Sequence, residues 1–164
     1  MSDRLAVMHS GRCEDLGAPE RVYDRPGSRF VANFLGNCNF LDLENDHGQL
    51  RLPDGTPVVI DSAHGATSGQ LGIRPEKLVI SRTVHADSAT TANRITATVT
   101  EATYLGASSE FQLSTSWGGT LMVFAQNIAD SARVRPGETV EVGWDPQHGF
   151  LVPETAAETA ADAA

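Results

Sequence analysis

An arginine and a glutamate flank a proline inside an otherwise apolar stretch, LGIRPEKLVIS, which runs from Leu71 to Ser81. Pro75 holds Arg74 in an extended conformation and offers no N–H to a strand ladder, so this position predicts the end of a strand. Arg74 and Glu76 are two residues apart and share one face of extended backbone. Two interpretations follow. Either Arg74 pairs with a carboxylate and fixes the corner between two strands, or both charges face a partner molecule.

A second candidate site is the sequence Tyr104-Leu105-Gly106. Gly106 is expected to permit a tight turn or a β-bulge, because glycine tolerates backbone conformations that other residues avoid. Tyr104 is either a core residue or part of an interface, and the sequence favours neither.

The motifs of common enzyme classes are missing from the sequence. It contains no GxxxxGK[ST] phosphate loop, no GxSxG elbow and no HExxH zinc motif. Two aspartates, Asp61 and Asp145, fit turns and strand ends better than a catalytic pair. The histidines are scattered and are expected at the surface: His9, His47, His64, His85 and His148. We therefore expect no catalysis within this chain, and we assign it no metal site or cofactor.

Charge and composition exclude several functions. The chain carries 21 acidic and 12 basic residues, a formal net charge of −9, and aromatic residues make up 6%. Proteins bind nucleic acids and anionic lipid surfaces mainly through basic residues, so neither is an expected partner of this acidic chain. Cys13 and Cys38 lack metal-ligand spacing and are expected to be free thiols in a reducing cytosol. No apolar run reaches transmembrane length, so we expect no membrane insertion and a soluble protein.

Residues 1–36 predict a short hairpin followed by two short helices. Arg4–His9 and Arg12–Leu16 read as strands joined by a Ser-Gly turn. A helix is expected from Pro19 to Tyr23. A second helix is expected after Ser28, a residue type that caps helices, and its apolar face is Phe30, Val31, Phe34 and Leu35, with Gly36 as the stop.

Residues 37–153 predict an all-β unit. Apolar and polar residues alternate in several short stretches, and turn-forming pairs separate them. The inward-facing residues are expected to be Ile95, Ala97, Val99, Phe111, Leu113, Val140, Val142 and Trp144. This pattern is typical of a small antiparallel barrel or sandwich. Thr83–Asn93 is expected to be a loop, and residues 154–164 a disordered acidic tail.

Residues 2–40 resemble a junction found in ATP-binding subunits of ABC importers, closest to the polyamine and ferric-iron systems. That junction reads "SDR.AVM..G.I.Q.GTP..IY..P...FVA.FIG..N". Here the matching positions are Asp3, Arg4, Gly11, Gly17, Pro19, Glu20, Tyr23, Pro26, Phe30, Val31, Ala32, Phe34 and Gly36. Ala18 departs from the family threonine and would deprive the first helix of a side-chain cap. LGIRPEKLVIS and the stretches 100–124 and 135–152 resemble the TOBE domain, the OB-like regulatory barrel of these subunits.

The resemblance implies a mainly β fold and a regulatory role. Residues 1–36 would be the last part of a nucleotide-binding domain plus a linker helix, residues 37–153 the TOBE regulatory domain, and residues 154–164 the tail. The phosphate loop, signature motif and Walker B acid of the family lie before this junction, so the chain resembles a truncated subunit. ATP and Mg²⁺ would belong to the parent subunit only. We expect this chain not to bind Mg-ATP.

The resemblance also implies partners. Family members work as dimers whose regulatory domains face each other, so a homodimer is expected, with Phe30 and Phe34 contributing to the contact. Arg74, Glu76, Tyr104 and Gly106 are the other candidate regulatory or interface residues. The parent complex would add membrane permease subunits and a substrate-binding protein, and would place the chain at the cytoplasmic face of the membrane. A polyamine is the expected class of transported substrate.

Two other functions remain as alternatives. Related barrels bind oxyanions such as molybdate, and the hydroxyls of Ser108 and Ser109 would suit a stand-alone oxyanion-binding module. An OB-fold nucleic-acid binder would need a basic groove with exposed aromatic residues, and the charge and composition count against it.

Overall fold

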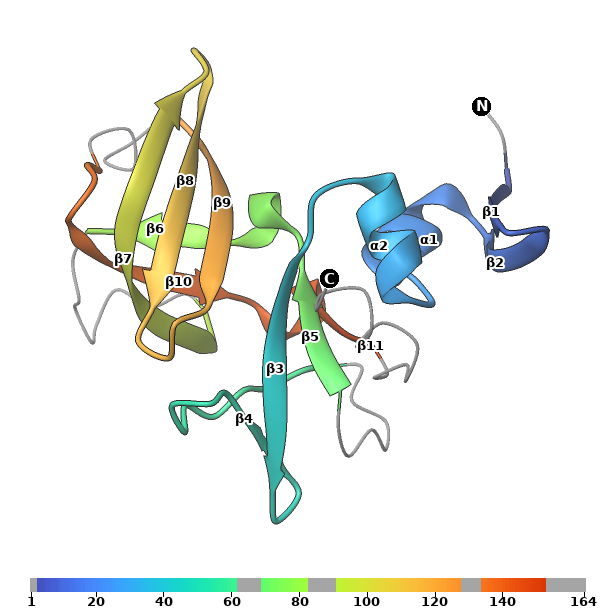
Figure 1. Ribbon diagram of the computed structural model, residues 1–164, viewed down its shortest axis with the longest axis horizontal. Coiled ribbons are helices and arrows are strands. Elements are labelled where there is room, and N and C mark those ends of the chain that lie inside the picture. The colour runs from blue at the N-terminus through green and yellow to red at the C-terminus, as the bar shows by residue number, and fades with distance from the viewer. Residues whose placement is uncertain (1–2, 62–68, 83–90, 128–133, 153–164) are drawn as a thin grey trace.

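The N-terminal hairpin consists of strands β1 (Leu5–His9) and β2 (Arg12–Gly17). Ser10 and Gly11 join them with positive φ angles of 47° and 76°, the conformation that two-residue hairpin turns require. The computed structural model describes residues 3–61, 69–82, 91–127 and 134–152 (Figure 1). The tail expected at 154–164 and most of the loop expected at Thr83–Asn93 lie outside these ranges, as do His64 and His85.

Two short helices follow the hairpin, as the sequence predicts. Helix α1 (Pro19–Asp24) has no side-chain cap at Ala18 and begins instead with proline in its first turn. Helix α2 (Arg29–Leu35) is capped by Ser28, whose hydroxyl accepts a hydrogen bond from the N–H of Val31 at 3.2 Å. Gly36, at φ 153°, ends α2 in a conformation that favours glycine.

The hairpin and helices form a small core of their own. Val7, Val22 and Val31 are buried there, and three partly buried side chains pack around them: Leu5, Phe30 and Leu35. The apolar faces of this segment are therefore partly covered within the chain. Phe34, however, is 64% exposed.

The carboxylate of Asp15 joins the hairpin to the helices. It accepts hydrogen bonds from the guanidinium of Arg21 and from the main-chain N–H groups of Leu16 and Gly27, the latter two at 2.8 Å. Partial burial raises the pKa of Asp15, but the hydrogen bond from Arg21 and those from the two N–H groups outweigh burial. The pKa of this carboxyl therefore lies below its ordinary value of 3.8.

We expect acid to loosen the N-terminal segment. Because the pKa of Asp15 is lower in the folded chain than in the unfolded chain, its stabilisation is fully present above the ordinary pKa of 3.8 and is lost as pH falls through the folded-state value. Asp15→Asn should lower the free energy of unfolding at pH 7 by about 1 kcal/mol, since these bonds are partly exposed. Denaturant unfolding at several pH values measures this. Equal stability of the two proteins at pH 7 would contradict it.

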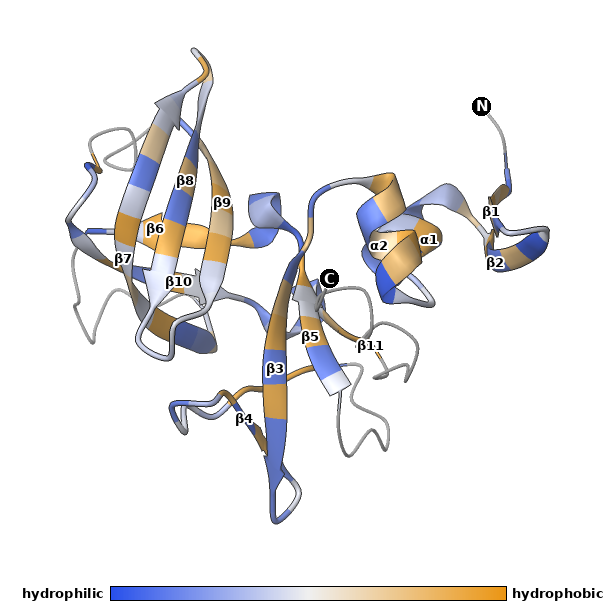
Figure 2. Cartoon of the chain, viewed as in Figure 1, coloured by the Kyte–Doolittle hydropathy of each residue, from blue (hydrophilic) through white to orange (hydrophobic). Residues whose placement is uncertain are grey.

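The larger sheet is antiparallel and has the strand order β6-β10-β7-β8-β9. Its strands are β6 (Val79–Ser81), β7 (Asn93–Tyr104), β8 (Ser108–Thr115), β9 (Thr120–Gln126) and β10 (Thr139–Trp144). The predicted alternation is confirmed, because Ile95, Ala97 and Val99 are buried while Thr96 and Thr98 are not. Figure 2 shows this banding along the strands, and Figure 1 shows the sheet curling.

The smaller sheet is also antiparallel and has the order β11-β5-β3-β4. Its strands are β3 (Asn39–Asp46), β4 (Gln49–Arg51), β5 (Gly69–Ile73) and β11 (Gly149–Val152). Two short 3₁₀ helices carry the chain between the sheets: η1 (Pro75–Lys77) leads from β5 to β6, and η3 (Pro146–His148) leads from β10 to β11. Each begins with proline, which fixes the direction of the crossover.

One hydrophobic core is shared by the two sheets. Trp144, Phe111, Leu71 and Ile73 are among its fully buried side chains. The core draws on strands of both sheets, so neither sheet is expected to fold without the other. The expected OB-like antiparallel β fold is confirmed.

Two buried asparagines connect the larger sheet to the smaller sheet and to the segment after β4. The side-chain amide of Asn39 in β3 donates to the carbonyl of Met122 in β9 at 2.8 Å and accepts from its N–H at 2.7 Å. Asn93 in β7 makes the same pair of bonds with Val59, after β4, at 2.8 and 2.7 Å. Each amide satisfies both main-chain polar groups of one residue, as a neighbouring strand would.

Candidate functional site

Among the candidate residues, Arg74 is held by several hydrogen bonds within the chain. It lies between β5 and η1 and is 1% exposed. Its Nη1 donates to the carbonyl oxygens of Ala32 at 2.8 Å and of Gly36 and Asn37 at 3.1 Å. Its Nη2 donates to the carbonyl oxygen of Tyr23 at 3.1 Å, and the guanidinium lies 4.1 Å from the centre of the Tyr23 ring. Arg74 therefore ties both helices to the barrel.

The sequence-based interpretations of Arg74 are corrected by this geometry. Pairing with a carboxylate is wrong, because the guanidinium binds main-chain carbonyl oxygens. These are available because the last carbonyl groups of a helix have no partner within it, and Gly36 ends α2 beside the arginine. At 1% exposure, the side chain also contributes almost no surface to a contact with a partner domain.

An apolar contact supports the same junction. Ala32 of α2 packs with Phe150 and Val152 of β11, and Cys38 and Phe40 pack around them. Burial raises the pKa of the Cys38 thiol to about 11. Cys38 is therefore a structural cysteine rather than a nucleophile.

Glu76 holds the tyrosine that covers Arg74. Its carboxylate accepts a hydrogen bond from the Tyr23 hydroxyl at 2.7 Å. Burial raises the pKa of Tyr23, and the hydrogen bond and negative charge of Glu76 raise it further. Glu76 is exposed, and its part in an interface stays a prediction.

Tyr104 and Gly106 lie at the tip of the β7–β8 hairpin. Gly106 has φ 86°, and a side chain there would meet no other atom, so it serves a tight turn. Tyr104 is 72% exposed and Leu105 is 57% exposed, so the core interpretation of Tyr104 is wrong. Its alternative role, in an interface, stays a prediction. Figure 2 shows the apolar colouring of this tip.

Ser108 and Ser109 begin β8. Ser109 is 4% exposed, and its hydroxyl donates to Oδ1 of Asn127 at 2.7 Å. Asn127 in turn donates to the carbonyl of Gly106 at 2.7 Å. The Ser109 hydroxyl thus supports the hairpin turn rather than standing free for an anion. Ser108 is half-buried.

Phe30 and Phe34 form an aromatic face on α2. Their rings stack with centres 5.9 Å apart, and His9 lies 4.1 Å from Phe30. Met8 and Leu16 of the hairpin are also exposed large apolar residues, at 58% and 47%. The N-terminal segment therefore leaves apolar surface uncovered, which in proteins often marks an interaction site.

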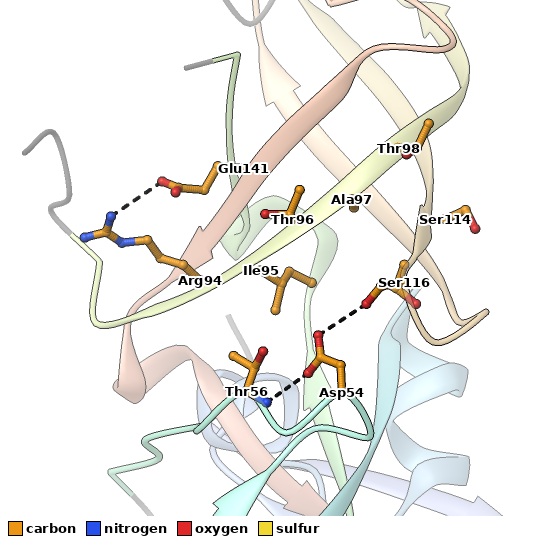
Figure 3. Close-up of a pocket in the computed structure, with 11 residues that line it drawn as sticks. Asp54, Thr56, Arg94, Ile95, Thr96, Ala97, Thr98, Ser114, Ser116 and Glu141 are labelled. Atoms are coloured by element: carbon orange, nitrogen blue, oxygen red, sulfur yellow. Dashed lines mark hydrogen bonds and ion pairs between the residues drawn. The ribbon is translucent and has the colours of Figure 1, made fainter. Parts of the chain in front are cut away.

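A cleft of about 370 Å³, which the sequence did not predict, lies where β7, β8 and β10 of the larger sheet meet the segment after β4 (Figure 3). Six of its eleven lining residues carry hydroxyl groups: Thr56, Thr96, Thr98, Ser114, Thr115 and Ser116. The charged side chains of the lining already have partners within the chain. Arg94 lies 3.7 Å from Glu141, and Asp54 accepts hydrogen bonds from the hydroxyl of Ser116 and from the N–H of Thr56. The cleft suits a neutral polar group. The alternating threonines of β7, which point away from the core, are the feature of the sequence that could have indicated it.

These features define a small antiparallel β-barrel with a helical segment attached, and the sequence places it in a family. The profile of the TOBE domain matches residues 71–152, half of the chain, so the chain belongs to the TOBE domain family. No helix among the described residues is long and apolar enough to cross a membrane, and the same residues hold no cluster of metal-ligating side chains.

Similar proteins include the spermidine/putrescine import ATP-binding proteins PotA of Rubrobacter xylanophilus and Thermobifida fusca. Each is 35% identical to this chain, over 162 and 166 residues. Each match covers 93% of this chain and 41% of the relative, so the chain spans about two fifths of the length of these relatives. The matched part is their C-terminal region, and their ATPase part lies outside it. Because 93% of the chain is covered, the match includes most of residues 1–36.

A solved structure has the same fold. The cytoplasmic molybdate-binding protein ModG, with molybdate bound, superimposes with a TM-score of 0.58 at 12% identity. The match covers 71% of this chain and 96% of ModG. At this identity the likeness establishes the fold alone.

Proposed function

We propose that this chain is the regulatory and dimerisation domain of the ATP-binding subunit of a binding-protein-dependent ABC importer, with polyamines as the transported class. The observation that carries the proposal is the 35% identity to spermidine/putrescine import ATP-binding proteins over 93% of the chain. The domain performs no catalysis itself. ATP and Mg²⁺ bind to the ATPase part of the parent subunit.

The proposed organisation assigns different roles to the two parts of the chain. Residues 1–36 pack on the ATPase core, which would cover the exposed side chains of Met8, Leu16 and Phe34. Residues 37–153 form the regulatory barrel. Arg74 joins the two parts through three main-chain carbonyl groups of residues 1–36, so a movement of the helices would be passed on to the barrel.

The proposed partners follow from the parent complex. They are a second ATP-binding subunit, the membrane permease subunits and a substrate-binding protein. The complex would hold this domain at the cytoplasmic face of the membrane. Glu76, Tyr104 and Gly106 are proposed to contribute to contacts within it, since Glu76 and Tyr104 are exposed.

In isolation the chain is expected to form a homodimer through residues 1–36, because pairing covers apolar surface at about 25 cal/mol per Å². Phe34→Ser should shift sedimentation velocity profiles towards the monomer. Val59→Ser is the matched control, since Val59 is also more than half exposed but lies in the barrel. The prediction would be contradicted if the unchanged chain were a strict monomer at high protein concentration, or if the two variants associated equally.

A chimera tests the proposed function. In a bacterium that lacks its spermidine/putrescine import ATP-binding protein, a relative whose matching region is replaced by this chain should restore spermidine uptake. The unchanged relative and a relative without that region are the controls. A chimera that accumulates and hydrolyses ATP, yet restores no more uptake than the shortened relative, would contradict the proposal.

Oxyanion binding at Ser108 and Ser109 is the alternative function. It is supported by the fold likeness to a molybdate-binding protein. The Ser109 hydroxyl, however, already donates its hydrogen bond to Asn127. The geometry of these two serines therefore favours the regulatory role.

A further inference from the structure

A second cleft lies where α1 ends beside the two crossovers η1 and η3. Its volume is about 260 Å³, several times the share of about 30 Å³ that one water molecule takes in the liquid. Each of the three elements contributes polar side chains, and the full lining is Asp24, Arg25, Arg74, Lys77, Gln147 and His148. The cleft is separate from the hydroxyl-lined cleft and from Ser108 and Ser109.

The charge of this cleft is opposite to that of the chain as a whole. Arg25, Arg74 and Lys77 line it, against a single carboxylate, that of Asp24, in a chain of net charge −9. The side chains of Arg25 and Lys77 have no hydrogen bond or ion pair with any residue in the described ranges. The other nearby carboxylate, Glu76, binds the Tyr23 hydroxyl and is not part of the lining.

Two nitrogen atoms of the lining are buried. Arg74 Nε and His148 Nδ1 have no hydrogen-bond partner among the described residues. Arg74 is also a buried cation whose bonds all go to neutral carbonyl groups, although buried charges in proteins are usually paired with an opposite charge. The buried charge of Arg74 therefore has no salt bridge among the described residues, and a bound anion would supply its counter-charge.

We propose that this cleft binds a phosphate-type oxyanion, held between Lys77 of η1, Arg25 after α1 and the buried charge of Arg74. A tetrahedral oxyanion offers several acceptor oxygens, and arginine and lysine are the side chains that bind such groups most strongly. The anion would bridge the helical segment and both crossovers. Because it binds the assembled junction, it would stabilise the attachment of the helices to the barrel.

Phosphate titration of the isotope-labelled chain tests the site. Sodium phosphate at constant ionic strength should cause saturable shifts of the main-chain amide signals of Lys77 and His148 in NMR spectra. Lys77→Gln and Arg25→Gln should each weaken binding about tenfold, the loss expected for one charge-assisted hydrogen bond. Arg12→Gln removes one exposed charge from the hairpin and should change nothing.

A second measurement uses the fact that Lys77 is the only lysine in the sequence. Phosphate should slow acylation of Lys77 by an amine-reactive reagent, measured by mass spectrometry, and sodium chloride at the same ionic strength should not. Titration with ATP, which this chain is expected not to bind, distinguishes the free anion from a nucleotide phosphate, because equal shifts at lower ATP concentration would contradict the free anion as the ligand. Shifts that sodium chloride reproduces, or equal phosphate affinity of Lys77→Gln and Arg12→Gln, would overturn the proposal. The chimera experiment is independent of these results.

Discussion

Replacing Arg74 with methionine is expected to lower the free energy of unfolding by about 3 kcal/mol or more, since each buried acceptor left without a donor costs about 1–3 kcal/mol. The carbonyl groups of Ala32, Gly36, Asn37 and Tyr23 would all lose their donor. Denaturant unfolding measures the total loss. Hydrogen exchange should show that residues 19–36 lose protection before the barrel strands.

Two variants define what Arg74 contributes. Arg74→Lys keeps the charge but not the planar fork, so most of the loss should remain. Arg94→Met is the matched control, because Arg94 is 30% exposed and lies 3.7 Å from its carboxylate partner, a geometry expected to contribute about 1 kcal/mol or less. Equal stability of Arg74→Met and Arg94→Met would show that the junction does not depend on this guanidinium.

Asn39→Asp is expected to destabilise the barrel by about 2–4 kcal/mol at pH 7, because a buried carboxylate oxygen would face the carbonyl of Met122 in place of a donor. Burial raises the pKa of such a carboxyl in the folded state. The loss should therefore shrink as pH falls, since the protonated carboxyl can donate to Met122. Thermal unfolding between pH 4 and pH 8 measures both effects.

Asn45→Asp is the control for this substitution. Asn45 is exposed, and its Oδ1 only accepts a hydrogen bond, from the N–H of Gly48 at 2.8 Å. Aspartate preserves that acceptor, so the change should stay within about 0.5 kcal/mol. A pH-independent loss in Asn39→Asp, or a loss no larger than that of Asn45→Asp, would argue against the role given to Asn39.

Much of the fold follows from local patterns in the sequence. Ser28 and Gly36 bound α2 as their residue types predict, and Ile95, Ala97 and Val99 face the core as their alternation predicts. These features depend on neighbours a few residues apart. The pairing of the strands into two sheets depends on contacts distant in sequence and was not predicted. The alternation predicted a barrel or sandwich, and the OB-like architecture came from the family resemblance.

The candidate site was predicted less well. The sequence singled out Arg74 from its place beside Pro75, but its hydrogen-bond acceptors are main-chain groups 37 to 51 positions away, which no side-chain pattern marks. Asn39 and Asn93 were missed because an asparagine before a strand usually indicates a turn. The cleft with Lys77 was missed because its lining comes from three separate segments.

The amide of Asn39 also bears on whether copies of this chain pair strand to strand. β9 is the last strand of its sheet, and the free N–H and C=O groups of an edge strand are a template on which another molecule can add a strand and aggregate. Both outward groups of Met122, in the middle of β9, are taken by Asn39. A strand from a neighbouring molecule would have to displace that amide before it could pair there. The residue that joins the two sheets therefore also protects an edge along which the molecules would otherwise assemble.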